Sequence, residues 1–145
     1  SYDQQSMLAI RFRGAEGDLT GTERVVWTRV QGAPYVPTPL LYGESLYFIR
    51  HFQGILTRVN ARTGEDRPGP LRLQGLGYVF ASPVGAEGRV YITDRDGTTL
   101  VLSDEDNPQL LATNRLDDIF SASAALVDAQ LFLRGERYLY CLSEN

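Results

Sequence analysis

Apolar and polar residues alternate along this chain in short runs, and turn-forming residues separate the runs. The runs are rich in Val, Leu, Ile, Tyr and Thr, and Gly, Pro or charged residues stand between them. Apolar spacing of i, i+3, i+4 and i+7 never persists over about a dozen residues, so helices are not predicted. The pattern therefore predicts an all-β fold. The strand candidates are residues 36–43, 45–52, 55–62, 70–74, 78–85, 89–95, 98–103 and 109–116.

The strand pattern also repeats. The segments TPLLYGESLYF, SPVGAEGRVYI and SAALVDAQLFL, which begin at Thr38, Ser82 and Ser123, align without gaps. Their starts lie 44 and then 41 residues apart, which matches the roughly 40 to 50 residues of a four-stranded propeller blade. The repeat therefore favours a β-propeller built from blades of four antiparallel strands. A β-sandwich with unrelated internal similarity is the alternative.

The strands of a blade are named A to D from the propeller axis outward. Tyr47, Tyr91 and Phe132 fall at one position of the B strand, so we expect them to be equally buried. A barrel or doubly wound sheet with helices between its strands is excluded, because the pattern shows no helices.

The repeat divides the chain, residues 1–145, into about three blades of a single propeller segment. Residues 7–30 are expected to end a preceding blade, 33–74 and 77–116 to form two blades, and 118–145 to form a partial blade without its D strand. Such an array exposes unpaired sheet edges, which soluble proteins avoid. We therefore expect either further blades or a head-to-tail homodimer that completes a propeller.

The segment SPVGAEGRVYITDRDGTTLVL, from Ser82 to Leu102, carries a family resemblance. It resembles the quinoprotein-like (PQQ-like repeat) propeller family, whose blades show S-P-x-x-x-x-G-x-V-Y followed by D-G-x-L-x-x-L. The family also has a tryptophan-docking pattern, A-x-D-x-x-T-G-K-x-x-W, between strands C and D. Partial copies of it are Asp18, Thr20, Gly21 and Trp27, and then Asn60, Thr63 and Gly64 without a tryptophan.

The resemblance implies the fold and leaves the function open, because one fold carries many functions. Members of the family include alcohol dehydrogenases that use pyrroloquinoline quinone, outer-membrane assembly scaffolds and secreted bacterial proteins. The dehydrogenases usually show a vicinal cysteine pair, calcium-liganding acidic residues and a catalytic aspartate. Cys141 has no neighbouring cysteine, so we expect no cofactor in this segment. The family also suggests a periplasmic or secreted location.

Composition and charge exclude several classes of partner. The chain has 18 acidic and 14 basic residues, a net charge of -4, and no basic stripe with interleaved aromatics, so nucleic acid is not an expected partner. No apolar run is long enough for a membrane span. One cysteine and one histidine cannot by themselves form a disulfide or a zinc site.

Two acidic segments invite a metal interpretation that their spacing does not support. In Asp94, Asp96 and Gly97 the calcium-loop frame fails, because Ile92 takes the first ligand position and no Glu stands at the twelfth. We predict a hairpin turn there instead, with Gly97 at positive φ and Asp96 capping. Residues 104–107 read as a solvated turn, so no metal is expected.

No catalytic constellation is assembled by the sequence. His51 has no nucleophile that can be placed beside it, and a glycosidase pair cannot be assigned among Glu44, Glu65, Asp117 and Asp118. We expect Cys141 to be a small buried core residue and Trp27 to pack between blades.

The remaining hypothesis concerns the D-to-A and B-to-C loops, which gather at one face of a propeller around its axis. Mixed charge and aromatic residues there suit a protein or carbohydrate surface. We therefore expect a non-catalytic binding or scaffolding propeller with a protein partner. The alternative is a fragment of a quinoprotein-type oxidoreductase, or of another propeller enzyme, whose catalytic residues lie in other blades. The candidate binding residues are Tyr35, Arg50, His51, Tyr78, Asp94, Arg95, Asp117, Asp118, Phe120, Arg134 and Arg137.

Overall fold

The structure is a computed structural model, and it describes residues 6–50 and 54–143. Within these ranges the regular structure consists of thirteen strands in four antiparallel sheets, which confirms the prediction of an all-β propeller fold. The same ranges contain no helix capable of crossing a membrane. The strands are β1 (Met7–Ile10), β2 (Val25–Arg29), β3 (Leu40–Tyr42), β4 (Ser45–Ile49), β5 (Ile55–Asn60), β6 (Leu71–Arg72), β7 (Val84–Ala86), β8 (Arg89–Thr93), β9 (Thr98–Ser103), β10 (Leu110–Arg115), β11 (Ala125–Val127), β12 (Gln130–Arg134) and β13 (Leu139–Ser143).

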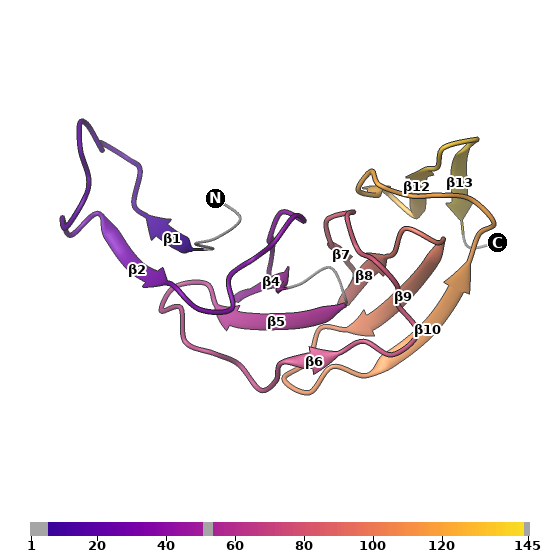
Figure 1. The fold of residues 1–145 in the computed structure, drawn as a ribbon, viewed down its shortest axis with the longest axis horizontal. Coiled ribbons are helices and arrows are strands. Elements are labelled where there is room, and N and C mark those ends of the chain that lie inside the picture. The colour runs from indigo at the N-terminus through magenta and orange to yellow at the C-terminus, as the bar shows by residue number, and fades with distance from the viewer. Residues whose placement is uncertain (1–5, 51–53, 144–145) are drawn as a thin grey trace.

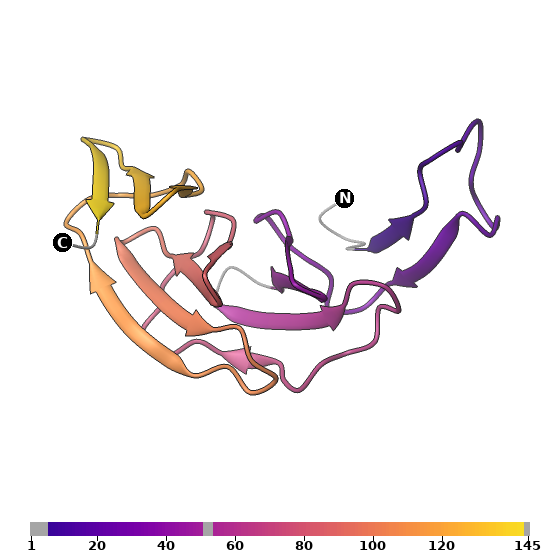
Figure 2. The ribbon, with the colours of Figure 1, turned by 180° about the vertical axis from the view of Figure 1, so that it is seen from behind.

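The sheets follow one another along an open arc (Figures 1 and 2). The two-stranded sheet β1–β2 lies at one end, and the three-stranded sheet β11–β12–β13 at the other. Between them stand the four-stranded sheets β3–β6, here called the first blade, and β7–β10, the second blade. The sheet β11–β13 is called the third blade.

The three blades share the same strand register. Tyr47, Tyr91 and Phe132 each pair with the residue seven positions earlier, in strands β3, β7 and β11 respectively. The hairpins that join these strands also share a left-handed backbone position, where Glu87 has φ 49° and Asp128 has φ 51°. Positive φ at this position matches the twist of a tight hairpin, and glycine meets it without strain in the first blade. The repeat frame is therefore a property of the backbone as well as of the sequence.

The expectation that Tyr47, Tyr91 and Phe132 are equally buried is wrong. Tyr47 is fully buried, whereas Tyr91 and Phe132 are half-buried. Tyr47 faces the second blade, whose turn after β9 closes over it. Tyr91 lines pockets of about 270 and 360 Å³ at the seam with the three-stranded third blade. Equivalent positions of the repeat therefore differ in burial because their surroundings in the neighbouring blade differ.

The main hydrophobic core lies between the first and second blades. Tyr47, Ile49 and Leu56 contribute from the first blade, and Val90 and Ile92 face them from the second. Because side chains alternate along a strand, every second residue of β4 and β8 meets in this core.

Two hydrogen bonds from backbone N–H groups to serine hydroxyls join the blades near the starts of their A strands. The backbone N–H of Thr38 donates to Oγ of Ser82, and the N–H of Ser82 donates to Oγ of Ser123, both at 2.9 Å. These residues are equivalent in the repeat, so each hydroxyl satisfies a backbone group of the preceding blade.

Trp27 packs between blades, as predicted. Its indole Nε1–H donates to the carbonyl of Ala61 at 3.1 Å. Gly64 faces the ring so closely that a Cβ there would stand 2.7 Å from it. Beside it, Arg29 pairs with Asp66 at 2.8 Å. These contacts fasten β1–β2 to the first blade.

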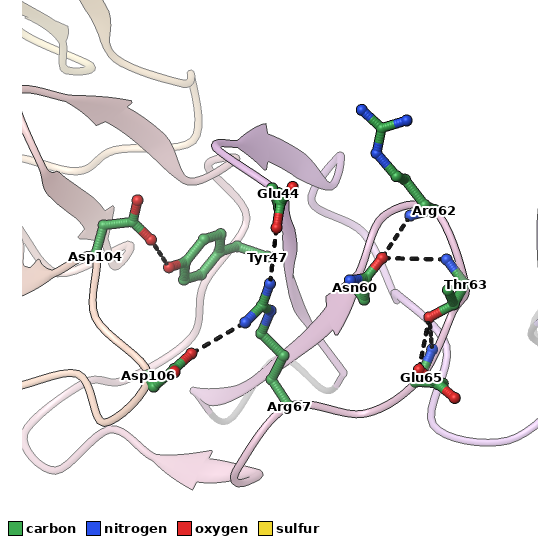
Figure 3. A network of polar contacts seen from close by, with 9 residues as sticks. All are labelled: Glu44, Tyr47, Asn60, Arg62, Thr63, Glu65, Arg67, Asp104 and Asp106. Carbon is green, nitrogen blue, oxygen red and sulfur yellow. Dashed lines mark hydrogen bonds and ion pairs between the residues drawn. The ribbon is translucent and has the colours of Figure 1, made fainter.

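The acidic turn after β9 holds the seam between the first and second blades (Figure 3). Asp104 accepts a hydrogen bond from the Tyr47 hydroxyl, and Arg67 pairs with Asp106 at 3.0 Å. Arg58, buried to 3% exposure, donates to the carbonyls of Glu105 and Asp106 at 2.7 and 2.6 Å. Desolvation, with the bond to Asp104 second, raises the pKa of Tyr47 to about 12. Residues 105–107 are exposed, as predicted, and the turn also joins the two blades, which the sequence did not indicate.

Cys141 is exposed, which contradicts its expected place in the core. It lies on β13, opposite Phe132 of β12. Among the described residues, no further blade packs against the face of the third blade that carries these two residues. Cys141 is therefore exposed although its neighbours in the sequence are apolar.

Candidate functional site

The D-to-A and B-to-C loops of the second and third blades are tied together through their backbones. The N–H of Arg95, in the turn after β8, donates to the carbonyl of Tyr78 at 2.7 Å. The N–H of Phe120 donates to the carbonyl of Arg95 at 3.0 Å, and that of Glu136 to Ile119 at 2.9 Å. The B-to-C turns and D-to-A loops of the second and third blades thus form one connected surface.

The candidate residues divide by exposure. Phe120, Asp94 and Asp118 are buried, with 0%, 1% and 6% exposure, so they act inside the loops. His51 lies outside the described residues. The half-buried candidates are Tyr35 and Arg50, and the exposed ones are Tyr78, Arg95, Asp117, Arg134 and Arg137.

Asp94 holds the turn between β8 and β9. Its carboxylate accepts the N–H of Thr98 at 2.7 Å and the N–H of Gly77, from the D-to-A loop, at 2.8 Å. The predicted hairpin turn is present, and Gly97 has φ 90°. The capping residue, however, is Asp94 and not Asp96, because the Asp94 carboxylate lies beside the two backbone donors.

Asp118 performs the same task in the third blade from the opposite side. Its carboxylate accepts the N–H groups of Ile119 at 2.8 Å and of Tyr138 at 3.2 Å, and the hydroxyl of Tyr140 at 3.2 Å. It also accepts the N–H of Arg137 at 3.1 Å. Burial alone would raise its pKa, but these hydrogen bonds outweigh burial and lower the pKa of Asp118.

The two aspartates occupy exchanged positions of the repeat. Gly77 and Asp118 are equivalent, and so are Asp94 and Gly135, because each pair is 41 residues apart. In the second blade the turn supplies the carboxylate and the loop supplies glycine; in the third blade the roles are reversed. A Cβ on Gly135 would collide with Oδ2 of Asp118. The carboxylates of Asp94 and Asp118 therefore bind backbone N–H groups and hold the loops together.

The arginines of this face differ in whether a carboxylate lies beside them. Arg137 lies 3.2 Å from Asp117 and 3.5 Å from Asp118, which raises its pKa despite desolvation. Arg95 stacks over the ring of Phe80, with its guanidinium carbon 5.7 Å from the centroid. Arg95 and Arg134 also line one pocket of about 210 Å³.

That pocket includes residues that the sequence did not indicate. Ile119, Ser121, Ala122 and Glu136 line it together with the two arginines. Residues of these types are common in loops, so their identities alone did not mark a pocket. The repeat spacing could have indicated Glu136, because it occupies the position equivalent to Arg95, 41 residues earlier.

The carboxylates considered for a glycosidase pair each have a neighbouring partner in the structure. Glu44 and Glu65 lie in the first blade, where Arg67 stands 3.9 Å from Glu44 and the Thr63 hydroxyl donates to Glu65 at 3.0 Å. Asp117 and Asp118 are in the third blade and engage Arg137. Among the described residues, no three His, Cys, Asp or Glu side chains gather as metal ligands.

Comparisons with known proteins support the fold. No protein-family model matches the chain, and no curated protein matches it either. Among solved structures, it is similar to BamB from Moraxella catarrhalis, at 15% sequence identity and a TM-score of 0.53. The match covers 84% of this chain and 50% of that one. The chain therefore shares the β-propeller fold of that structure and spans half of its length.

Proposed function

We propose that this chain is a non-catalytic binding or scaffolding propeller segment that meets a protein partner with its loop face. The observation that supports this most is the use of the acids on that face. Asp94 and Asp118 are committed to backbone donors, whereas Tyr78, Arg95 and Arg134 are exposed. A rigid surface with exposed aromatic and charged residues suits recognition more than chemistry.

Cross-linking of a purified complex tests this proposal. The chain carries no Lys, so carboxylate-directed reagents are the suitable choice. We expect cross-links to a protein partner to concentrate on Asp96, Asp117 and Glu136. Cross-links confined to the outer corners at Glu16, Glu65 or Glu105 would contradict a loop-face partner.

A fragment of a quinoprotein-type oxidoreductase is the second candidate. Its support is the repeat resemblance, together with a chain that spans half of the structure it matches. Equilibrium dialysis with pyrroloquinoline quinone and calcium distinguishes the two candidates. We expect no tight binding by this chain, and a micromolar complex would favour the enzyme fragment.

A second copy of the chain is also proposed as a partner, joined head to tail. Large apolar side chains are exposed at both ends of the array, including Leu8 at 49% and Leu139 at 70%. The two terminal sheets hold two and three strands, five in all, against four in each complete blade. Placing β2 beside β13 of another copy therefore requires β1 to be displaced.

Size exclusion with light scattering tests this association. We expect a mass of twice 16.2 kDa at micromolar concentration. Limited proteolysis of the dimer should release residues from β1, because exchange frees that strand. A mass of 16.2 kDa with cooperative unfolding would exclude the dimer.

A further inference from the structure

Arg95 and Arg134 meet at one pocket without a carboxylate partner among the described residues. The pocket lies on the loop face, has a volume of about 210 Å³, and is completed by Ser121, Gly135 and Glu136. It is smaller than the roughly 300 Å³ at which ligand and cofactor sites begin. It has room for a single side chain.

The loop backbones around the pocket are held together without a ligand. The hydrogen bonds from Phe120 to Arg95 and from Glu136 to Ile119 join the two turns through the loop between them. The ring of Phe80 positions the Arg95 guanidinium without neutralising its charge. Binding a ligand would therefore require little loss of conformational entropy in these loops.

The charge of Arg134 departs from the repeat. At the same position of β4 and β8 the chain has Ile49 and Thr93, which are 0% and 4% exposed. Nearby Arg137, by contrast, pairs with two aspartates. A local break in a repeat pattern is typical of functional positions.

We propose that this pocket binds one carboxylate side chain of a protein partner, with Arg95 and Arg134 donating to its oxygens. The guanidinium fork matches the geometry of a carboxylate. With Glu136 on the wall the charged lining residues sum to one positive charge, which one carboxylate neutralises, so the partner carries an isolated Glu or Asp flanked by neutral or basic residues. This inference rests on the proposed loop-face function and names the chemistry of the partner.

An NMR titration of the ¹⁵N-labelled chain tests the proposal. The probe is the peptide acetyl-Ala-Leu-Glu-Lys-Ala-amide, and its control has Gln in place of Glu. We expect saturable shifts at Ile119, Ser121 and Gly135 with the Glu peptide and much smaller shifts with the Gln peptide. Arg134→Ala or Arg95→Ala should weaken binding about tenfold, whereas Arg62→Ala, at an exposed corner, should not.

Arg134→Lys provides a second variant that keeps the charge but removes the fork, and we expect an intermediate loss of affinity. Equal binding of both peptides, full binding by the two Ala variants, or tighter binding of inorganic phosphate than of acetate would overturn the carboxylate site. A protein partner that cross-links to the loop face and binds both Ala variants normally would refute this pocket alone. Cross-links elsewhere would instead refute the proposed function.

Discussion

At the scale of single residues, equivalent positions of the repeat keep a task while changing the residue that performs it. The Asp94 carboxylate accepts the N–H of Gly77, and the Asp118 carboxylate accepts the N–H groups of Arg137 and Tyr138 beside Gly135, so each joins a D-to-A loop to a B-to-C turn. Either side can supply the carboxylate, provided that the other side leaves room for it.

Gly135→Ala is therefore expected to destabilise the chain by about 1–3 kcal/mol, because its Cβ would collide with the Asp118 carboxylate. Gly77→Ala is the matched control. A Cβ there would stand 3.0 Å from a carboxylate oxygen of exposed Asp96, which can move away. Urea unfolding of both variants measures the difference, and an equal effect would contradict the exchanged roles.

Asp118 gives the stability a defined dependence on acid. Its pKa is lowered in the folded chain, so its contribution is present above the ordinary value of 3.8 and is lost as pH falls through the lower folded value. Asp118→Asn should therefore be less stable than the wild type at pH 7, and the two should converge in strong acid. Urea midpoints measured across acidic pH check this, with Asp117→Asn as the exposed control.

Tyr47 gives the opposite dependence at alkaline pH. Its pKa is raised from 10.0 to about 12, so its contribution is complete below pH 10 and is lost as pH rises through 12. At neutral pH, Tyr47→Phe should cost about 1–3 kcal/mol, because Asp104 loses a hydrogen bond. Tyr91→Phe, at the half-buried equivalent position, should cost less in the same urea melts.

At the scale of elements, side chains of one blade complete their packing and hydrogen bonds on the neighbouring blade. The strand β2 shows this directly, since Trp27 reaches out of its own sheet to the turn around Ala61 and Gly64 in the first blade. The docking pattern therefore belongs to a junction between blades.

Trp27→Phe should loosen β1–β2 while leaving the core between the first and second blades intact. The phenyl ring cannot donate to the Ala61 carbonyl, a loss of about 1 kcal/mol. Limited proteolysis should then cut within residues 11–24 earlier than in the wild type, and exposed Thr28→Ala serves as the control. Simultaneous cleavage throughout the chain would contradict independent docking.

At the scale of the whole molecule, protection should be greatest at the centre of the arc and least at its ends. The central core joins β4 and β5 to β8 and β9, whereas β1 and β13 each have one free edge within the described residues. Hydrogen exchange should therefore be slowest in the four central strands and fastest in β1 and β13. Strong protection of β13 would indicate that a partner strand covers it.

The sequence by itself determined the architecture of the chain. Alternating apolar positions, turn residues and the spacing from Thr38 to Ser82 to Ser123 predicted all-β blades in one register. Trp27 was assigned between blades correctly. These features depend on local backbone preference and on the two-residue periodicity of strands, both of which can be read along a sequence.

Tertiary structure alone decided burial and the use of charge. Tyr47 and Tyr91 are equivalent in sequence but not in burial, and Cys141 is exposed despite its apolar neighbours. Asp94 caps the turn where Asp96 was expected, and Asp118 is buried while adjacent Asp117 is exposed. The physical reason is that these properties depend on which neighbouring blade covers a residue and which backbone donors lie beside it, and sequence spacing within one repeat specifies neither.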